Sequence, residues 1–289
     1  MKYSVSDTDA SPYDSGSYAS STTYITGKAV EKACQKLIAR ILEIASGMLE
    51  APVEELVFAS DHVEWPKEQK SVSLEDIGTK SMCGNGCALE VTESNTSPTS
   101  PPPFMAGAVE IELDKETGHV EILDYKAVVD CGTVVNPNLA RVQTEGGLVQ
   151  GIGMTLYENI QYNEKGRMLN NSFMQYKVPS RRDMGNLQVE FESSYEPTGP
   201  FGAKSIGEIV INTPAPALAQ AIANATGIWF KDLPITSEQI AMGVLEKELA
   251  KIKYIRKIYS ETICNQTQKL LQYWVTFRKN MWRPLRCSY

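Results

Sequence analysis

The amino-acid sequence predicts an α+β protein in which mixed, twisted sheets pack against helices. Two observations lead to this class. In some segments apolar residues recur every three to four positions, the period of an amphipathic helix, and in others they alternate with polar residues, the period of a half-buried strand. In chain order the segments run helix, mixed strands, glycine-rich helix, strand and helix, and that order is typical of an α+β arrangement.

Four segments have the apolar spacing of helices. They are Lys28–Glu50, Glu145–Glu158, Ile209–Ala225 and Pro234–Glu248. Asn136–Gln143, with Pro137 near its first turn, is predicted to be a turn or helix start that leads into the second segment. Thr236 or Ser237 is placed to cap the last helix. Cys34 falls in the middle of the first helix and is predicted to be a small core residue.

Strand patterns lie between the first two helices and after the second. They are Val53–Trp65 (a strand or a small hairpin), Gly107–Leu113, Val120–Asp130 and Leu187–Tyr195. The segment Thr92–Pro103 is rich in Ser, Thr and Pro and is predicted to be a linker or surface loop. Residues 1–23 have little apolar periodicity, so we expect a loop or a disordered start there.

The overall composition is that of a soluble globular protein. Hydrophobic residues make up 42% of the 289 residues and charged residues 22%, which is enough apolar material for one large core or two smaller ones. No apolar run reaches the length of a bilayer span, and the first residues have no secretory-signal pattern. The sequence therefore predicts a cytoplasmic protein that does not bind a membrane.

The end of the chain differs in charge from the rest. From Lys251 onward there are nine lysines and arginines and one acid, Glu261, although the whole chain has a formal charge of −7. We therefore divide the chain into residues 1–248 and a basic, aromatic tail of unknown role at residues 249–289. A basic tail can bind nucleic acid, but a solvated or partner-docking helix is favoured, and no nucleic-acid partner is predicted.

Residues that could hold a metal ion directly are scarce. The chain has two histidines, and of its six cysteines only Cys83 and Cys87 lie close together. Their C-x3-C spacing is one residue too long for a redox pair, and no second pair completes a zinc or iron–sulfur set. We expect no metal site made by the protein alone. His62 follows Asp61 and is a candidate base with an orienting acid, although a turn histidine is favoured.

Glu208 is the first of two polar residues that the sequence pattern marks as candidates for a functional site. It ends the glycine-rich segment Gly199–Glu208 and precedes a predicted helix. We expect it to be buried and poorly solvated, with the exposed N–H groups of the helix start stabilising its ionised form. Lys204, four residues earlier, is placed to neutralise it. The pattern alone also allows a capping or surface glutamate.

Gln150 is the second candidate residue, because it lies in a segment with helical apolar spacing that contains four glycines. These are Gly146, Gly147, Gly151 and Gly153. Each costs about 1 kcal/mol relative to alanine in a helix interior, so the pattern indicates close backbone approach to another element or to a ligand. The Gln150 amide can both donate and accept hydrogen bonds. A glutamine that faces solvent is the alternative.

Several stretches resemble the molybdenum hydroxylase family, which contains xanthine dehydrogenase, aldehyde oxidase and nicotinate dehydrogenase. They are VVDCGTVVNPNLARVQTEGGLVQGIGMTLYE (Val128–Glu158), GPFGAKSIGEIVIN from Gly199, SDTDASPYDSGSYASSTTYITGKAV (Ser6–Val30) and LPITSEQI (Leu233–Ile240). The resemblance covers about residues 5–247 in order. It implies that this part of the chain is the C-terminal portion of a molybdopterin-binding domain, whereas the tail matches nothing in the family pattern.

The resemblance also implies roles for single residues. Glu208 is implied to be the catalytic base, which takes a proton from the hydroxide on molybdenum so that its oxygen can attack an electron-poor carbon of the substrate. Gln150 and Gly151 are implied to contact the cofactor near the metal, to which the protein supplies no ligand. Contacts to the pterin are implied for four consecutive residues, Ala19, Ser20, Ser21 and Thr22.

The implied function is that of an oxidoreductase subunit. It would hydroxylate an N-heterocycle, xanthine-like or nicotinate-like, or an aldehyde, with water as the oxygen source. The cofactor is molybdopterin, either as such or in its cytosine dinucleotide form, and electrons leave to iron–sulfur and FAD partner subunits. The family's earlier segments are not in this sequence, so an N-terminal molybdopterin-binding chain is a further expected partner, and sheet edges should be open unless a partner covers them. The alternative is an incomplete, non-catalytic fragment that acts only as a structural half-domain.

Overall fold

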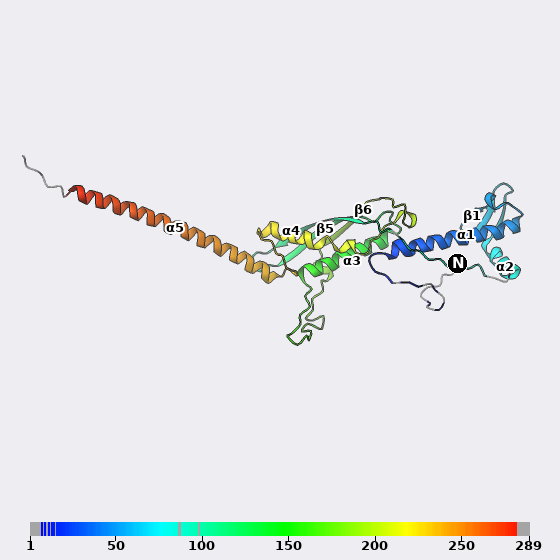
Figure 1. Ribbon diagram of the computed structural model, residues 1–289, viewed down its shortest axis with the longest axis horizontal. Helices are drawn as coiled ribbons and strands as arrows, with labels where there is room; N and C mark the ends of the chain where they lie inside the picture. Colours follow the sequence, from blue (N-terminus) through cyan, green and yellow to red (C-terminus); the bar gives the residue numbers. More distant parts are fainter. Residues whose placement is uncertain are drawn as a thin grey trace, which may run out of the picture.

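The computed structural model describes residues 16–281 apart from 86, 87 and 98, together with residues 7, 9, 11, 13 and 14. These residues form two packed units, each with its own sheet and its own hydrophobic core (Figure 1). The α+β class predicted from the sequence is confirmed. Of the two cysteines that lie close together in the sequence, Cys83 is exposed and Cys87 lies outside the described residues.

The first unit is a small antiparallel sheet packed against one long helix. Its elements are α1 (Gly27–Leu49), β1 (Val57–Phe58), β2 (His62–Trp65), β3 (Lys70–Ser73) and α2 (Leu74–Asn85), with strand order β1-β2-β3. Its buried core residues are Ile41, Ala45, Ala51, Leu56, Val63 and Ile77. The α1 helix and the β1–β2 hairpin were predicted. The sequence missed α2 because Ile77 is its one fully buried apolar side chain, which leaves no helical apolar period to detect.

Cys34 is exposed on α1, which corrects the predicted core position. The buried residues of this helix, Ile41 and Ala45, lie in its C-terminal half, where the first unit covers it. Cys34 precedes them, in the N-terminal half of α1. A position in the helix therefore did not mean a buried one, because Cys34 lies on an exposed side of α1 and the buried residues come later in the helix.

The second unit is a three-stranded mixed sheet with two helices packed on it. Its elements are β4 (Phe104–Leu113), β5 (Val120–Asp130), α3 (Pro137–Leu156), β6 (Asn186–Phe191) and α4 (Pro214–Thr226). β5 lies in the middle, antiparallel to β4 and parallel to β6. The core joins the buried side chains of β5, among them Ile122 and Tyr125, to Leu148 of α3 and Leu218 of α4. Among the described residues no further strand pairs with the outer edges of β4 and β6.

The two helices of this unit begin at prolines. Asn136 caps α3 by accepting a hydrogen bond from the Leu139 N–H at 3.1 Å, and Pro137 is the first helical residue, as the sequence indicated. The predicted helix at Ile209–Ala225 is different, because a separate 3-10 turn at Ile209–Ile211 precedes an α-helix that begins only at Pro214. Without an N–H, Pro214 cannot donate to the Val210 carbonyl four residues earlier, so no continuous α-helix runs through from Ile209.

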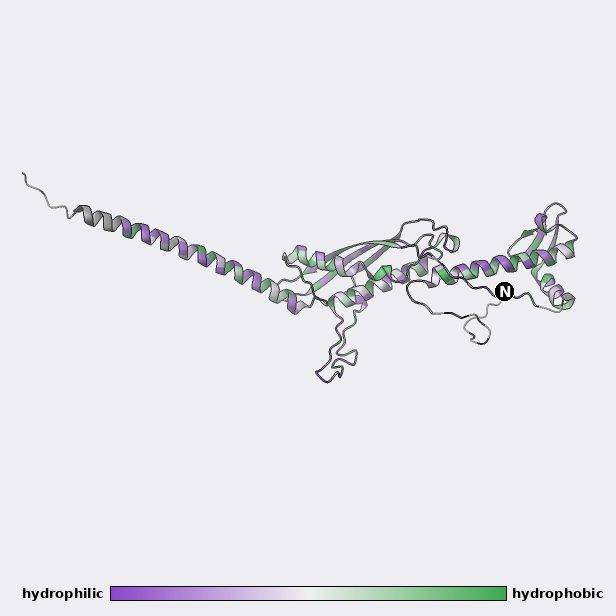
Figure 2. Cartoon of the chain, viewed as in Figure 1, coloured by the Kyte–Doolittle hydropathy of each residue, from purple (hydrophilic) through white to green (hydrophobic). Residues whose placement is uncertain are grey.

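The last helix is far longer than predicted. α5 spans Ser237–Met281 and crosses the expected division at residues 248 and 249 without a break. Thr236 is its N-cap, since its hydroxyl accepts from the Gln239 N–H at 3.2 Å and its own N–H donates to the Gln239 side chain at 2.9 Å. Past residue 248 the helix projects away from the second unit (Figures 1 and 2), and residues 249–262 and 265–272 are exposed. Within the described part of the chain, no helix has the length and hydropathy needed to cross a bilayer.

Candidate functional site

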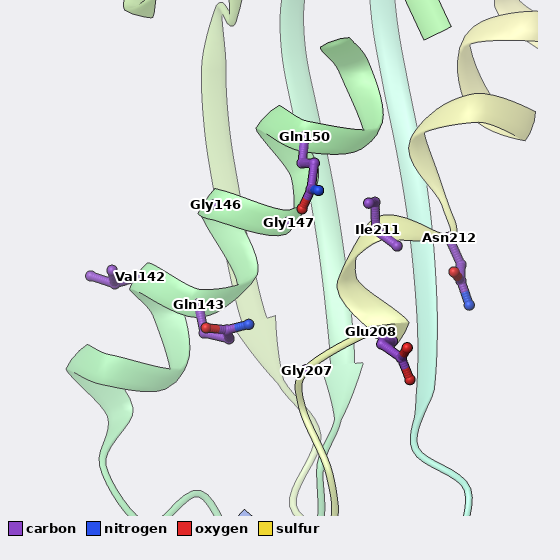
Figure 3. A pocket seen from close by; sticks show the side chains of 9 residues that line it. All are labelled: Val142, Gln143, Gly146, Gly147, Gln150, Gly207, Glu208, Ile211 and Asn212. Carbon is purple, nitrogen blue, oxygen red and sulfur yellow. The ribbon is translucent and has the colours of Figure 1, made fainter. Parts of the chain in front are cut away.

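A pocket of about 780 Å³ lies between one face of α3 and the segment that precedes α4. Figure 3 shows α3 on one side, with Gln143 and Gln150, and Glu208 with Asn212 on the other. The lining residues are Val142, Gln143, Gly146, Gly147, Gln150, Gly207, Glu208, Ile211 and Asn212. The structure therefore brings two of the predicted site residues, Gln150 and Glu208, to the same cavity from positions 58 residues apart in the sequence.

The pocket face of α3 combines amide side chains with an open backbone. Gln143, Gly146 and Gln150 follow one another at intervals of three and four residues, which places them on the same side of a helix. A Cβ added at Gly146 would meet no other atom within 4 Å, so the helix backbone is open to a ligand at this position. Gln143 was not predicted as a site residue, although its spacing of seven residues from Gln150 places both on one side of a helix.

Other glycines of α3 allow close packing against protein. A Cβ added at Gly147 would lie 2.2 Å from Val210 Cγ2, and one added at Gly151 would lie 2.7 Å from Pro214 Cγ. Gly151 is buried and does not line the pocket. This packing lets α3 approach the start of α4, and the cofactor contact that the family resemblance implies for Gly151 stays a prediction.

This assignment predicts opposite effects for two Gly→Ala substitutions on the same helix. Gly151→Ala should destabilise the protein by about 1–3 kcal/mol, because the new methyl group overlaps Pro214. Gly146→Ala should leave stability unchanged or raise it by up to about 1 kcal/mol, since alanine favours the helix and meets no atom. Thermal unfolding of the two variants checks this, and equal melting temperatures would contradict the packing assignment.

Glu208 is exposed, which corrects the prediction of a buried carboxylate at a helix start. It precedes only the 3-10 turn at Ile209–Ile211, not an α-helix, so it lacks the run of free N–H groups expected there. Glu208 lines the pocket on the side opposite α3, and its carboxylate contacts Ser20 of the N-terminal segment.

Lys204 does not neutralise Glu208 as expected. Its ammonium group is buried and lies 2.7 Å from the Asp130 carboxylate. Asp130 also accepts hydrogen bonds from the Ser194 hydroxyl at 2.5 Å and the Gly132 N–H at 3.0 Å. Burial acts to raise the pKa of the Asp130 carboxyl, but these three donors together hold that pKa below its ordinary value. Lys204 therefore anchors the segment that leads to Glu208 onto the end of β5.

Of the four residues predicted to contact the pterin, Ser20 forms hydrogen bonds with Glu208. Its hydroxyl oxygen accepts a hydrogen bond from the Glu208 N–H at 2.6 Å and donates to Glu208 Oε2 at 3.2 Å. None of the four predicted residues of this segment, Ala19, Ser20, Ser21 and Thr22, lines the pocket itself. Ser21 instead closes the turn of this segment, because its hydroxyl donates to the Tyr18 carbonyl at 2.8 Å.

His62, the candidate base next to Asp61, lies in the first unit and does not line this pocket. The two ring nitrogens of His62 contact Asp61 at 2.6 Å and Glu64 at 2.7 Å. Hydrogen bonds to Asp61 and Glu64 raise the pKa of His62 above its ordinary value. His62 is therefore the first residue of strand β2 and not the turn histidine that the sequence favoured, and it pairs with two acids at the surface.

A carboxylate and three amide side chains around a glycine-lined cavity form a site for a small ligand rich in hydrogen-bonding groups. Comparison with known proteins identifies the family. The family model of the molybdopterin cofactor-binding domain matches residues 1–185, and the chain belongs to this family. The molybdenum hydroxylase resemblance seen in the sequence is thereby confirmed.

Several relatives support this assignment. The chain is 37% identical over 246 residues to a probable hypoxanthine oxidase of Escherichia coli, covering 83% of this chain and 25% of that protein. It is 35% identical over 246 residues to the gamma subunit of the 6-hydroxypseudooxynicotine dehydrogenase complex of Paenarthrobacter nicotinovorans, covering 81% and 31%. The chain thus spans about a quarter to a third of the length of these relatives.

Solved structures show the same fold. A Cu,Mo CO dehydrogenase superposes with a TM-score of 0.70 at 25% identity, over 83% of this chain and 31% of that one. The quinoline 2-oxidoreductase of Pseudomonas putida 86 superposes with a TM-score of 0.70 at 24% identity, over 82% and 32%. The arrangement of two small sheets and their helices is therefore the fold of this family.

Proposed function

We propose that the chain forms part of the cofactor-binding subunit of a molybdenum hydroxylase and that Glu208 is its general base. The observation that carries the proposal is the position of Glu208 opposite the amide-bearing face of α3, across a pocket of about 780 Å³ (Figure 3). A carboxylate at the mouth of such a pocket can take a proton from a substrate or from water within hydrogen-bond reach.

The residues around the pocket fit molybdopterin. The Gln143 and Gln150 amides each offer a donor and an acceptor, which suits the alternating groups of a pterin edge, and Gly146 leaves the backbone open beside them. We assign these three residues to cofactor binding. When bound, the cofactor supplies the two-electron oxidation of a substrate carbon, with water as the source of oxygen. The part of this chain is to hold the cofactor and to accept a proton at Glu208.

We infer the substrate class and the partners from the relatives. A probable hypoxanthine oxidase and a 6-hydroxypseudooxynicotine dehydrogenase complex are both among them, which supports an N-heterocycle as the substrate, with an aldehyde as the alternative. We propose that iron–sulfur and FAD subunits carry the electrons away, that the cofactor is held as molybdopterin or its cytosine dinucleotide form, and that the enzyme works in the cytoplasm.

We further propose that another polypeptide segment completes the site. Glu208 is exposed and the pocket has protein on the α3 side and the Gly207–Asn212 side, whereas a cofactor site that excludes water needs a further wall. The chain also covers only 25% of the hypoxanthine oxidase relative. We propose that an N-terminal molybdopterin-binding chain supplies this wall.

Metal analysis of two preparations tests the proposal. Molybdenum should co-purify close to one per chain when this chain is isolated with its partner polypeptides, and at a small fraction of that when it is purified alone. Both preparations should be compared by metal analysis and by pterin fluorescence after oxidation. Stoichiometric molybdenum in the isolated chain would contradict the shared site, and no molybdenum in either preparation would contradict the function.

A second candidate function is that of a non-catalytic structural half-domain. The exposure of Glu208 favours it, because an open pocket cannot by itself exclude water from a reaction. The two candidates differ in what happens when the N-terminal chain is supplied: the enzyme subunit gains molybdenum and turnover, whereas the structural half-domain gains neither.

A further inference from the structure

The N-terminal segment makes a turn with unusual backbone angles where it meets Glu208. Ala19 and Ser20 have φ values of 49° and 58°, and the Ser21 N–H donates to the Tyr18 carbonyl at 3.0 Å. Two consecutive left-handed residues closed by this bond have the form of a type I′ turn, which glycine, asparagine and aspartate usually fill. Each non-glycine residue in this region costs free energy, and such strain persists only where surrounding contacts fix it.

The contacts that fix this turn come from the segment that precedes Glu208. Gly207 packs against the turn so closely that an added Cβ would lie 2.9 Å from Ser20 Oγ and 3.1 Å from Ser20 Cα. A few residues later, the buried Tyr24 hydroxyl lies 2.5 Å from the Thr198 hydroxyl. The segment is therefore fastened at two points to the stretch between Thr198 and Glu208, and one of these points is the hydroxyl of Ser20.

The Ser20 hydroxyl is hydrogen-bonded to both the backbone and the side chain of Glu208. It accepts from the Glu208 N–H at 2.6 Å and donates to Oε2 at 3.2 Å. Within the described residues Oε1 has no hydrogen-bond partner, and the Lys204 ammonium group is engaged with Asp130. One carboxylate oxygen is thus tethered while the other is left to accept a proton.

We infer that Ser20 is a positioning residue for Glu208, holding Oε2 so that Oε1 stays free to accept a proton. The inference rests on the proposed role of Glu208 as the base and replaces the pterin contact expected for Ser20 by a contact to protein. An orienting hydrogen bond of this kind restricts the side chain to one rotamer before the reaction, so that less entropy is lost on reaching the reactive geometry.

A double-mutant cycle in the assembled, cofactor-loaded enzyme tests this. Ser20→Ala should lower kcat by about tenfold, the scale of one lost hydrogen bond to a charged group, with KM and molybdenum content unchanged. In the Glu208→Gln background the same substitution should have no further effect, because the group that it positions no longer accepts a proton. Ser193→Ala is the control, since Ser193 is an exposed serine with no hydrogen-bond partner in the described structure.

Two further measurements separate positioning from folding. Ser20→Gly removes the same hydroxyl but tolerates the left-handed φ, so it should reproduce the loss of kcat in a stably folded enzyme. In crystals of that variant the Glu208 side chain should spread over more than one rotamer. A single unchanged rotamer, or a loss of molybdenum in either variant, would overturn the inference.

The kinetic outcomes also keep the two proposals apart. If Glu208→Gln loses turnover and Ser20→Ala does not, the positioning role fails and the base stands. If Ser20→Ala has the same effect in both backgrounds, Ser20 acts independently of Glu208 and the inference is wrong. If Glu208→Gln retains full turnover, the proposed function fails and the positioning role fails with it.

Discussion

Replacing Glu208 by glutamine in the assembled enzyme is expected to lower kcat by at least about a hundredfold while leaving molybdenum content unchanged, because general-base catalysis contributes roughly 10²–10⁴ to the rate. Glutamine has the same shape as glutamate, and its side-chain oxygen can accept the hydrogen bond from Ser20 that Oε2 accepts now. It cannot accept a proton. The substitution therefore removes the proposed chemistry and leaves the packing in place.

Turnover and metal content must be measured on the same preparation, with Glu116→Gln as the matched control. Glu116 lies exposed in the turn between β4 and β5, away from the pocket, so the same change of charge there should leave both quantities unaltered. A parallel fall in molybdenum and kcat in Glu208→Gln would make Glu208 a cofactor-retaining residue. Unchanged kcat would remove it from the catalytic machinery.

Lys204→Met should cause the largest loss of stability, about 3 kcal/mol. The Lys204 ammonium and the Asp130 carboxylate form an ion pair at 2.7 Å with side chains 9% and 20% exposed, and removing one partner leaves a largely buried charge unpaired. Lys126→Met is the control, because Lys126 is 64% exposed and pairs with Asp124 at 3.3 Å, a surface pair with a contribution of about 0–1 kcal/mol. Urea unfolding of the full chain gives both values, and equal losses would contradict a special role for Lys204.

The same pair predicts how stability depends on pH. Because the pKa of Asp130 is lower in the folded protein than its ordinary value of 3.8, its ionised form stabilises the fold above that value, and the stabilisation is lost as pH falls through the lowered pKa. The stability difference between the wild type and Lys204→Met should therefore be constant above about pH 5 and shrink below about pH 4. A difference that stays constant on acidification would show that Asp130 and Lys204 are not coupled.

Most of the second unit could be predicted from the sequence because its elements obey simple periods. β5 buries alternate residues such as Val120 and Ile122 on one face, and Asn136 followed by Pro137 marks the start of α3. The family motifs then identified Glu208 and Gln150, which periodicity alone left open. The hydrophobic period was sufficient to predict the secondary structure of segments that pack along their whole length.

The errors arose where tertiary contacts decide the outcome. Lys204 is four residues from Glu208 in sequence, but its partner is Asp130 on β5, which no local spacing indicates. Gly151 and Gly146 have the same sequence signature, yet one meets Pro214 and the other open space. The bond from Ser20 to Glu208 joins positions 188 residues apart, so only the folded chain could reveal it.

The location of molybdenum in the assembled enzyme tests the central claim most directly. Crystals of the complex, measured with anomalous scattering at the molybdenum absorption edge, should give a peak within the pocket between the Gln143–Gln150 face of α3 and Glu208. The Ser20 hydroxyl should still be bonded to Glu208 in that structure. A molybdenum peak elsewhere, with this pocket filled by protein side chains or water, would contradict the account.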